Sequence, residues 1–222
     1  QAMAFAHRQG VIHRDLKPLN IMVGAHGEVQ VMDWGLAKDI SAGESKGEPD
    51  ESSDRSVHPE SLIETTVGDI VGTLAYMPPE QARGEEQLTC AADVFALGSM
   101  LCEVLTGFPA YHGKSLNEVM RRAITADLAD AQERLKQCDG DPNLVEITLN
   151  CLAADPTERP HDASVLAEQL ADHRTGIEQR LQQERLSAER ERGAAVAREA
   201  SLLNQAKWER RRRRLTTFLS LA

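Results

Sequence analysis

Four polar residues near the start of the chain have types and a spacing that could do chemistry. Asp15, Lys17 and Asn20 lie close together in the sequence, and Asp33 follows thirteen residues after Asn20. A carboxylate can orient a hydroxyl nucleophile, and an ammonium group can neutralise charge on a transferring anionic group. Amide and carboxylate oxygens are the hard ligands that magnesium prefers. The set therefore suits transfer of a phosphoryl group.

Two short β-branched segments are expected to position these groups. Residues 21–23 and 29–32 are predicted strands, and residues 25–28 between them have the composition of a hairpin turn. Because a hairpin brings its two ends together, Asn20 and Asp33 are expected to face one ion. The surrounding sequence is predicted to be mainly α-helical, with helices at 1–10, 93–106, 115–126, 143–154 and 163–173.

Charge is unevenly distributed along the chain. The net charge is −10, from 25 Lys and Arg against 35 Asp and Glu. Residues 174–214 hold 12 Lys and Arg against 6 Asp and Glu, so the preceding 173 residues carry a balance of −16. An acidic body argues against nucleic-acid binding, which needs cations that neutralise phosphates. The four cysteines lack Cys-x-x-Cys spacing, which indicates reduced thiols and argues against a zinc site.

The segment 39–64 has a composition unlike the rest of the chain. It contains six serines, eight acids, two glycines and two prolines, with few apolar residues. Such a segment cannot bury a core of its own, so a mobile loop is predicted.

A long polar helix is predicted over residues 173–209. Its apolar positions form a ragged heptad, interrupted by glutamates, so a dimeric coiled coil and a solvated connecting helix are both open. Residues 210–222 combine an arginine cluster with an apolar run, which is typical of the start of a transmembrane helix. The eight residues of that run are too few to span a bilayer, which takes about 20. A basic tail and a nucleic-acid-binding arm are the alternatives.

Several motifs, in order along the chain, resemble those of one family. Over residues 1–172 the chain is similar to the C-terminal lobe of a serine/threonine protein kinase, in the style of bacterial receptor-type kinases, with an activation segment at 33–80. The motifs are His13-Arg14-Asp15-Leu16-Lys17-Pro18-Leu19-Asn20, Asp33-Trp34-Gly35, Gly72-Thr73 and Tyr76-Met77-Pro78-Pro79-Glu80. The implied fold is a mainly α lobe with a small β-hairpin, followed here by a long C-terminal helix.

The resemblance implies roles in catalysis and in binding of ATP. Asp15 would orient the substrate hydroxyl, and Lys17 would neutralise charge on the transferring phosphoryl group. Asn20 and Asp33 would bind Mg²⁺. Met22 would lie under the adenine ring, although a residue of an alternating strand is more often plain core.

Other residues would shape and regulate the acceptor site. Thr73, after Gly72, would hydrogen-bond to the catalytic aspartate and lysine. Arg14 would be satisfied by a phosphate on the activation segment. Thr65 and Thr66 are the candidate phosphorylation sites, and an ordinary exposed threonine pair is the alternative.

A third group in the resemblance would be structural. His13 and Trp34 would pack in an internal apolar stack, with Trp34 in place of the usual phenylalanine. Asp93 would accept hydrogen bonds from the backbone of the catalytic loop. Glu80 and Arg159 would form a buried ion pair.

The implied function is an ATP- and Mg²⁺-dependent kinase acting on Ser and Thr hydroxyls of proteins, at the cytoplasmic face of a membrane. The glycine-rich loop and the lysine and glutamate that hold ATP would lie upstream of residue 1, so the chain alone is expected to be inactive. The alternatives are a pseudokinase scaffold and, from residues 174–222 only, a membrane-anchored arm. The four polar residues favour the enzyme, because a scaffold has no chemical need for all of them.

Overall fold

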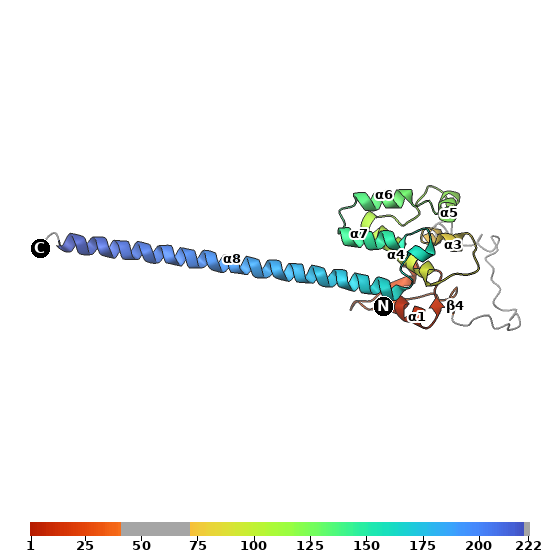
Figure 1. The fold of residues 1–222 in the computed structure, drawn as a ribbon, viewed down its shortest axis with the longest axis horizontal. Helices are drawn as coiled ribbons and strands as arrows, with labels where there is room; N and C mark the ends of the chain where they lie inside the picture. Colours follow the sequence, from red (N-terminus) through yellow and green to blue (C-terminus); the bar gives the residue numbers. More distant parts are fainter. Residues whose placement is uncertain (41–71, 220–222) are drawn as a thin grey trace. The chain divides into compact units, whose positions relative to one another are not determined.

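The computed structural model describes residues 1–40 and 72–219 of the chain (Figure 1). Thr65, Thr66 and the serine-rich segment from residue 41 onward lie outside the described residues. The chain divides into two compact units, residues 1–171 and 172–222.

A short helix and a strand pair open the first unit. Helix α1 covers Ala2–Arg8, and strand β1 covers Val11–Ile12. Gly10 lies between them at φ 74°, a left-handed conformation that glycine adopts without strain. Strand β4 (Lys38–Asp39) pairs antiparallel with β1, so the two ends of the segment that holds the four polar residues lie side by side.

A hairpin lies between these two strands. The 3-10 helix η1 (Pro18–Asn20) leads into strand β2 (Ile21–Val23), which pairs antiparallel with strand β3 (Val29–Val31). Gly27 makes the tight turn at φ 84°. The partner of Ile21 is Val31, so the start of β2 and the end of β3 are adjacent.

Helix α4 (Cys90–Thr106) forms the centre of the first unit. The Thr89 side chain caps its start by accepting a hydrogen bond from the backbone N–H of Ala91. Gly107 ends it in a left-handed conformation at φ 82°. The helix begins three residues before the predicted start at Asp93, because the cap at Thr89 precedes the first strongly apolar turn.

The remaining helices of the first unit are short. α4 packs most extensively against α7 and also contacts α6, while α3 contacts α5. Helix α6 was not predicted from the sequence, because most of its residues are polar and only Ala131 and Leu135 are buried. The helix bounds are α3 Pro79–Ala82, α5 Leu116–Ile124, α6 Ala129–Gln137, α7 Pro142–Cys151 and the 3-10 helix η3 Pro156–Glu158.

Helices α4 and α7 are in close contact at Gly98. A Cβ atom added to Gly98 would lie 2.5 Å from the Cβ of Cys151, closer than real carbon atoms approach. The absence of a side chain at Gly98 therefore permits this helix contact.

Helix α8 is continuous from Ala163 to Leu219, whereas the sequence predicts an end near residue 173 and a new helix after it. No proline interrupts residues 163–219, and Gly176 alone does not end the helix. In the first unit Ala163 and Leu166 are buried. In the second, every side chain from residue 178 on whose exposure is described is exposed. No helix in the described part of the chain is long and apolar enough to cross a membrane.

Candidate active site

Asp93 on α4 holds the backbone of the loop that follows β1. Its Oδ2 accepts a hydrogen bond from the His13 N–H at 2.7 Å, and its Oδ1 accepts one from the Arg14 N–H at 2.9 Å. Arg14 has a φ of 72°, which is unfavourable for a residue with a side chain. The buried carboxylate of Asp93 compensates for this conformation, in the role expected from the sequence.

His7 on α1 extends this connection to α8. The His7 Nδ1 accepts a hydrogen bond from the backbone N–H of Ala163 at 3.0 Å, so the ring proton lies on Nε2. Nε2 then donates to Asp93 Oδ2 at 3.0 Å. Hydrogen bonds thus run from the first turn of α8, through two buried side chains, to the loop.

Asp15, Lys17, Asn20 and Thr73 form a connected cluster. The Lys17 Nζ lies 2.9 Å from Asp15 Oδ2 and donates to Thr73 Oγ1 at 2.8 Å. The Asn20 Nδ2 donates to the Asp15 backbone oxygen at 2.7 Å and to Asp15 Oδ2 at 3.0 Å. One carboxylate oxygen of Asp15 therefore has two donors, which fixes the orientation of the group. The expected contact between Thr73 and Lys17 is present.

Asp33 follows β3, on the side of the hairpin where Asn20 precedes β2. The backbone N–H of Met32 donates to the backbone oxygen of Asn20 at 2.8 Å, which brings the two segments together. Asn20 uses both amide hydrogens on Asp15, and this leaves its side-chain oxygen to serve as a ligand.

The oxygens of Asn20 and Asp33 fit a hard cation such as Mg²⁺. Among the described residues there is no group of three or more His, Cys, Asp or Glu side chains able to hold a metal ion. Additional ligands for Mg²⁺ at this position would have to be phosphate oxygens and water, as is usual for this ion.

His13 and Trp34 lie in contact beneath the loop. Their ring centroids are 4.7 Å apart in an edge-on arrangement. His13 is fully buried, and its Nδ1 accepts a hydrogen bond from the Asp15 N–H. Its Nε2–H donates a hydrogen bond to the Met32 carbonyl at 3.0 Å. Trp34 is 40% exposed, so it lies at the edge of the stack rather than inside it as the sequence suggested.

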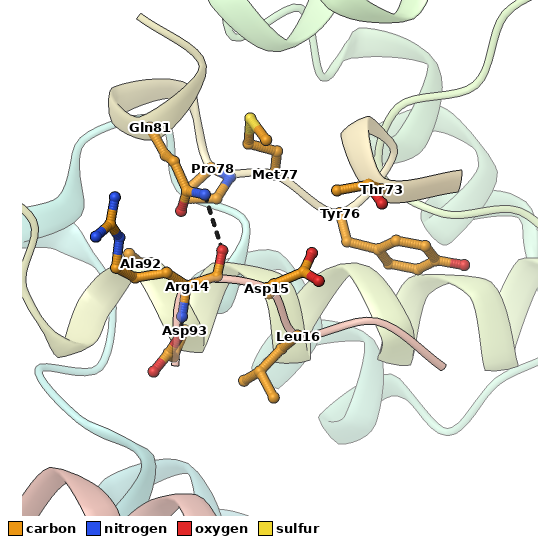
Figure 2. A pocket seen from close by; sticks show the side chains of 11 residues that line it. Arg14, Asp15, Leu16, Thr73, Tyr76, Met77, Pro78, Gln81, Ala92 and Asp93 are labelled. Carbon is orange, nitrogen blue, oxygen red and sulfur yellow. Dashed lines mark hydrogen bonds between the residues drawn. The ribbon is translucent and has the colours of Figure 1, made fainter. Parts of the chain in front are cut away.

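A narrow pocket adjoins the catalytic loop (Figure 2). Figure 2 shows Arg14 and Asp15 with side chains that point in opposite directions. The Gln81 Nε2 donates to the Arg14 backbone oxygen at 2.8 Å. Within the described residues, the buried Nε of Arg14 and Oε1 of Gln81 have no hydrogen-bond partner. On the far side of the pocket, the Tyr76 hydroxyl donates to Glu103 at 2.7 Å; burial and this carboxylate raise the Tyr76 pKa above its usual value.

Glu80 and Arg159 form the ion pair expected from the sequence. The two terminal guanidinium nitrogens of Arg159, Nη1 and Nη2, lie 2.7 and 2.9 Å from the two carboxylate oxygens of Glu80, and both residues are buried. Arg159 also donates to the Ala91 carbonyl and lies 4.9 Å over the Phe95 ring. The bidentate pair joins α3, within the predicted activation segment, to the segment after α7.

Met22 is not a core residue. Its side chain is 48% exposed. The hairpin and the segments next to it in sequence contain further large, exposed apolar side chains. They are Leu19, Val23, Val29, Met32, Trp34 and Leu36. Val23 and Val29 lie at the turn end of the hairpin, and the other side chains lie nearer the end at Asn20 and Asp33.

Comparison with known proteins identifies the family. The sequence model of the protein kinase domain matches residues 1–174. The serine/threonine-protein kinase PknD of Protochlamydia amoebophila is 35% identical over 180 residues, 79% of this chain and 18% of that protein. PknB of Mycobacterium tuberculosis strain H37Rv is 36% identical over 164 residues, 74% of this chain and 23% of that protein.

The chain belongs to the serine/threonine protein kinase family. It spans about a fifth of the length of the two relatives. PknB of Mycolicibacterium smegmatis matches to a similar extent, at 35% identity over 164 residues.

Two residues of this kinase site were missed by the sequence alone. His7 is a polar residue on the otherwise apolar, buried face of α1, and that position was the available signal. Gln81 follows the motif that ends at Glu80, and nothing in its local sequence indicated that its amide would reach Arg14.

Proposed function

We propose that residues 1–171 act as the C-terminal lobe of an ATP-dependent protein serine/threonine kinase. The observation that carries the proposal is the hydrogen-bonded cluster of Asp15, Lys17 and Asn20, joined through a backbone bond to the segment that ends in Asp33. A catalytic carboxylate, a cation and two metal ligands are the parts that phosphoryl transfer requires.

Asp15 is the residue that orients the nucleophile. Lys17 and Asn20 both bond to its Oδ2, which leaves Oδ1 to accept a hydrogen bond from a substrate Ser or Thr hydroxyl. Lys17 also contacts Thr73 at the edge of the acceptor site, where its charge can stabilise the transferring phosphoryl group.

Asn20 and Asp33 are the residues that would hold Mg²⁺. When bound, the ion bridges the phosphates of ATP and offsets their charge. The 48% exposed side chain of Met22 supports an adenine position beside the hairpin. Because this side chain is open to solvent, we propose that further kinase elements cover it in the active enzyme, and the 222-residue chain alone is expected to transfer phosphate poorly.

The deciding experiment compares this chain with the longer kinase that contains it. Labelled phosphate from ATP is expected to appear on Ser or Thr of a protein substrate only with the longer protein and Mg²⁺. Asp15→Asn is expected to reduce transfer by roughly 10²–10⁴-fold, with an unchanged circular dichroism spectrum. Absence of transfer by the longer, folded protein under all substrate conditions favours the alternative, a pseudokinase scaffold.

Arg14 is proposed to regulate the site. Its buried Nε has no partner among the described residues, and its side chain lines the pocket that adjoins the catalytic loop. A phosphate on Thr65 or Thr66 would supply a strong acceptor for this guanidinium. Phosphopeptide mapping of active enzyme is expected to find one of the two modified, and Arg14→Gln is expected to remove the dependence of activity on that phosphate. Active enzyme with both threonines unmodified would refute this regulation.

Residues 210–222 are proposed to begin a membrane anchor, with the arginine cluster at the cytoplasmic face and the apolar run after residue 214 entering the membrane. Support comes from five consecutive arginines that precede an apolar run. The chain is expected to float with anionic vesicles, and replacement of the five arginines by glutamine should abolish the effect. Equal flotation of both proteins, or of neither, would contradict the proposal.

A further inference from the structure

The loop that presents Asp33 carries a hydrogen bond that the usual phenylalanine could not make. The indole Nε1–H of Trp34 donates to the backbone oxygen of Val31 at 3.0 Å. Val31 is the last residue of β3 and is fixed by its pairing with Ile21. The bond therefore ties the residue after Asp33 to the strand before it.

Asp33 has an uncommon backbone conformation that such a restraint would hold in place. Its φ is 58°, in the left-handed region that residues with side chains seldom occupy, although aspartate tolerates it better than most. A conformation of this kind persists only where its surroundings determine it. Trp34 supplies two contacts to that end: the indole bond to Val31 and the edge-on contact with the buried ring of His13.

Simple burial does not account for Trp34, because its ring is 40% exposed. The two contacts that define its position are directional. Two further hydrogen bonds lie within this loop: Gly35 N–H to Asp33 Oδ1 at 3.4 Å and Ala37 N–H to the Trp34 carbonyl at 3.0 Å. Neither joins the loop to β3 or to His13.

We propose that Trp34 is a positioning residue, whose indole N–H locks Asp33 in the orientation that places its carboxylate beside Asn20 for metal binding. The metal-binding role of Asp33 in this proposal rests on the proposed kinase function. The lock itself is a property of residues 31–37 and can be measured without catalysis.

The chain has two tryptophans, Trp34 and Trp208, which gives a direct test by NMR. In ¹⁵N-labelled protein the two indole N–H signals are assigned with Trp208→Phe. The Trp34 signal is expected to exchange with solvent at least about five-fold more slowly than the signal of Trp208, whose side chain is 75% exposed. Equal exchange of the two signals overturns the lock, and this measurement needs no substitution at Trp34.

Trp34→Phe is the matched variant, because phenyl keeps an aromatic ring next to His13 and removes only the donor. It is expected to speed amide exchange of Gly35 and Ala37 about five-fold, with exchange in α4 unchanged. Unchanged exchange at Gly35 and Ala37 overturns the proposal.

A second readout separates the lock from the proposed function. Mn²⁺, a paramagnetic substitute for Mg²⁺, is added together with excess ATP, which supplies the phosphate ligands. It is expected to broaden the Gly35 amide signal in the wild-type chain, and to do so about five-fold less strongly in Trp34→Phe. Broadening that is equal in the two proteins overturns the positioning role. Protected exchange without broadening in either protein rejects the metal site of the proposed function and its link to Trp34, while the hydrogen bond itself stands.

Discussion

Tyr76 and Tyr111 are both buried in the first unit, yet their hydroxyl groups are in different situations. Tyr76 donates to Glu103 at 2.7 Å. Tyr111 is 1% exposed and stacks on Phe95, and its hydroxyl has no hydrogen-bond partner among the residues that the structure describes. A bonded and an unbonded buried hydroxyl should respond in opposite directions to removal.

Tyr76→Phe is expected to lower the free energy of unfolding by about 1.5–3 kcal/mol, the range for a hydrogen bond to a charged group. Tyr111→Phe is expected to be neutral or to raise that free energy by about 1 kcal/mol, because it removes an unsatisfied polar atom. Urea unfolding of both variants measures the difference. Equal destabilisation by the two substitutions would contradict the contrast between the two sites.

The Glu80–Arg159 pair gives a second prediction for individual residues. Glu80→Gln is expected to destabilise the first unit by about 3–5 kcal/mol, because it leaves a buried guanidinium without its counter-charge. The double variant Glu80→Gln/Arg159→Met should cost less than the sum of the two single changes. A double-mutant cycle in urea measures the coupling, and additive effects would show that the pair is not coupled.

At the scale of elements, the close approach of α4 and α7 depends on one glycine. Gly98→Ala is expected to lower the unfolding free energy by about 1–3 kcal/mol, because the new methyl group meets Cys151. Gly176→Ala is the matched control, since a Cβ at that position of α8 would meet nothing within 4 Å. It should leave stability unchanged or raise it by up to about 1 kcal/mol. Thermal unfolding followed by circular dichroism distinguishes the two outcomes.

Some elements could be predicted from the sequence and others could not, for physical reasons. The β2–β3 hairpin and the buried helix α4 follow from local patterns: β-branched residues around a glycine turn, and apolar residues at a helical period. Helix α6 buries too few apolar residues for its period to be visible. The boundary predicted near residue 173 contains no proline, so the continuity of α8 depends on the absence of a strong breaker rather than on a pattern.

The active site divides in the same way. Short motifs contain the four polar residues Asp15, Lys17, Asn20 and Asp33, and the residue types and their spacing indicate the chemistry. The contact of Lys17 with Thr73 was predicted from the family resemblance. The position of Trp34 at the edge of the stack could not be predicted, since it depends on a backbone oxygen and on the space around His13. His7 was also missed because its two partners are distant in sequence.

At the scale of the whole molecule, buried thiol and phenol groups are expected to make the free energy of unfolding fall at alkaline pH. Burial raises the pKa of the Cys151 thiol from 9.0 to about 12, and it raises the pKa of Cys102 and of Tyr111 as well. These groups bind their protons more tightly in the folded than in the unfolded chain. The stability that they contribute is present below pH about 9 and is lost as the pH rises from about 9 toward 12.

The urea midpoint is therefore expected to fall steadily over that alkaline range. Cys151→Ala should make the decline shallower, although the cavity that it creates lowers stability at every pH. The comparison is of slopes against pH rather than of absolute stability. An identical slope in the variant would remove Cys151 as a cause.

The bonds from Ala163 through His7 and Asp93 to the catalytic loop also carry a consequence for synthesis on the ribosome. The loop at residues 13–20 is translated well before one anchor of its support, because Ala163 lies 156 residues further along the chain than His7. At about 5–20 residues per second, the loop must wait roughly 8–30 s for that anchor. During this interval the nascent chain lacks a fully supported catalytic loop, which delays completion of the active site until most of the first unit has been made.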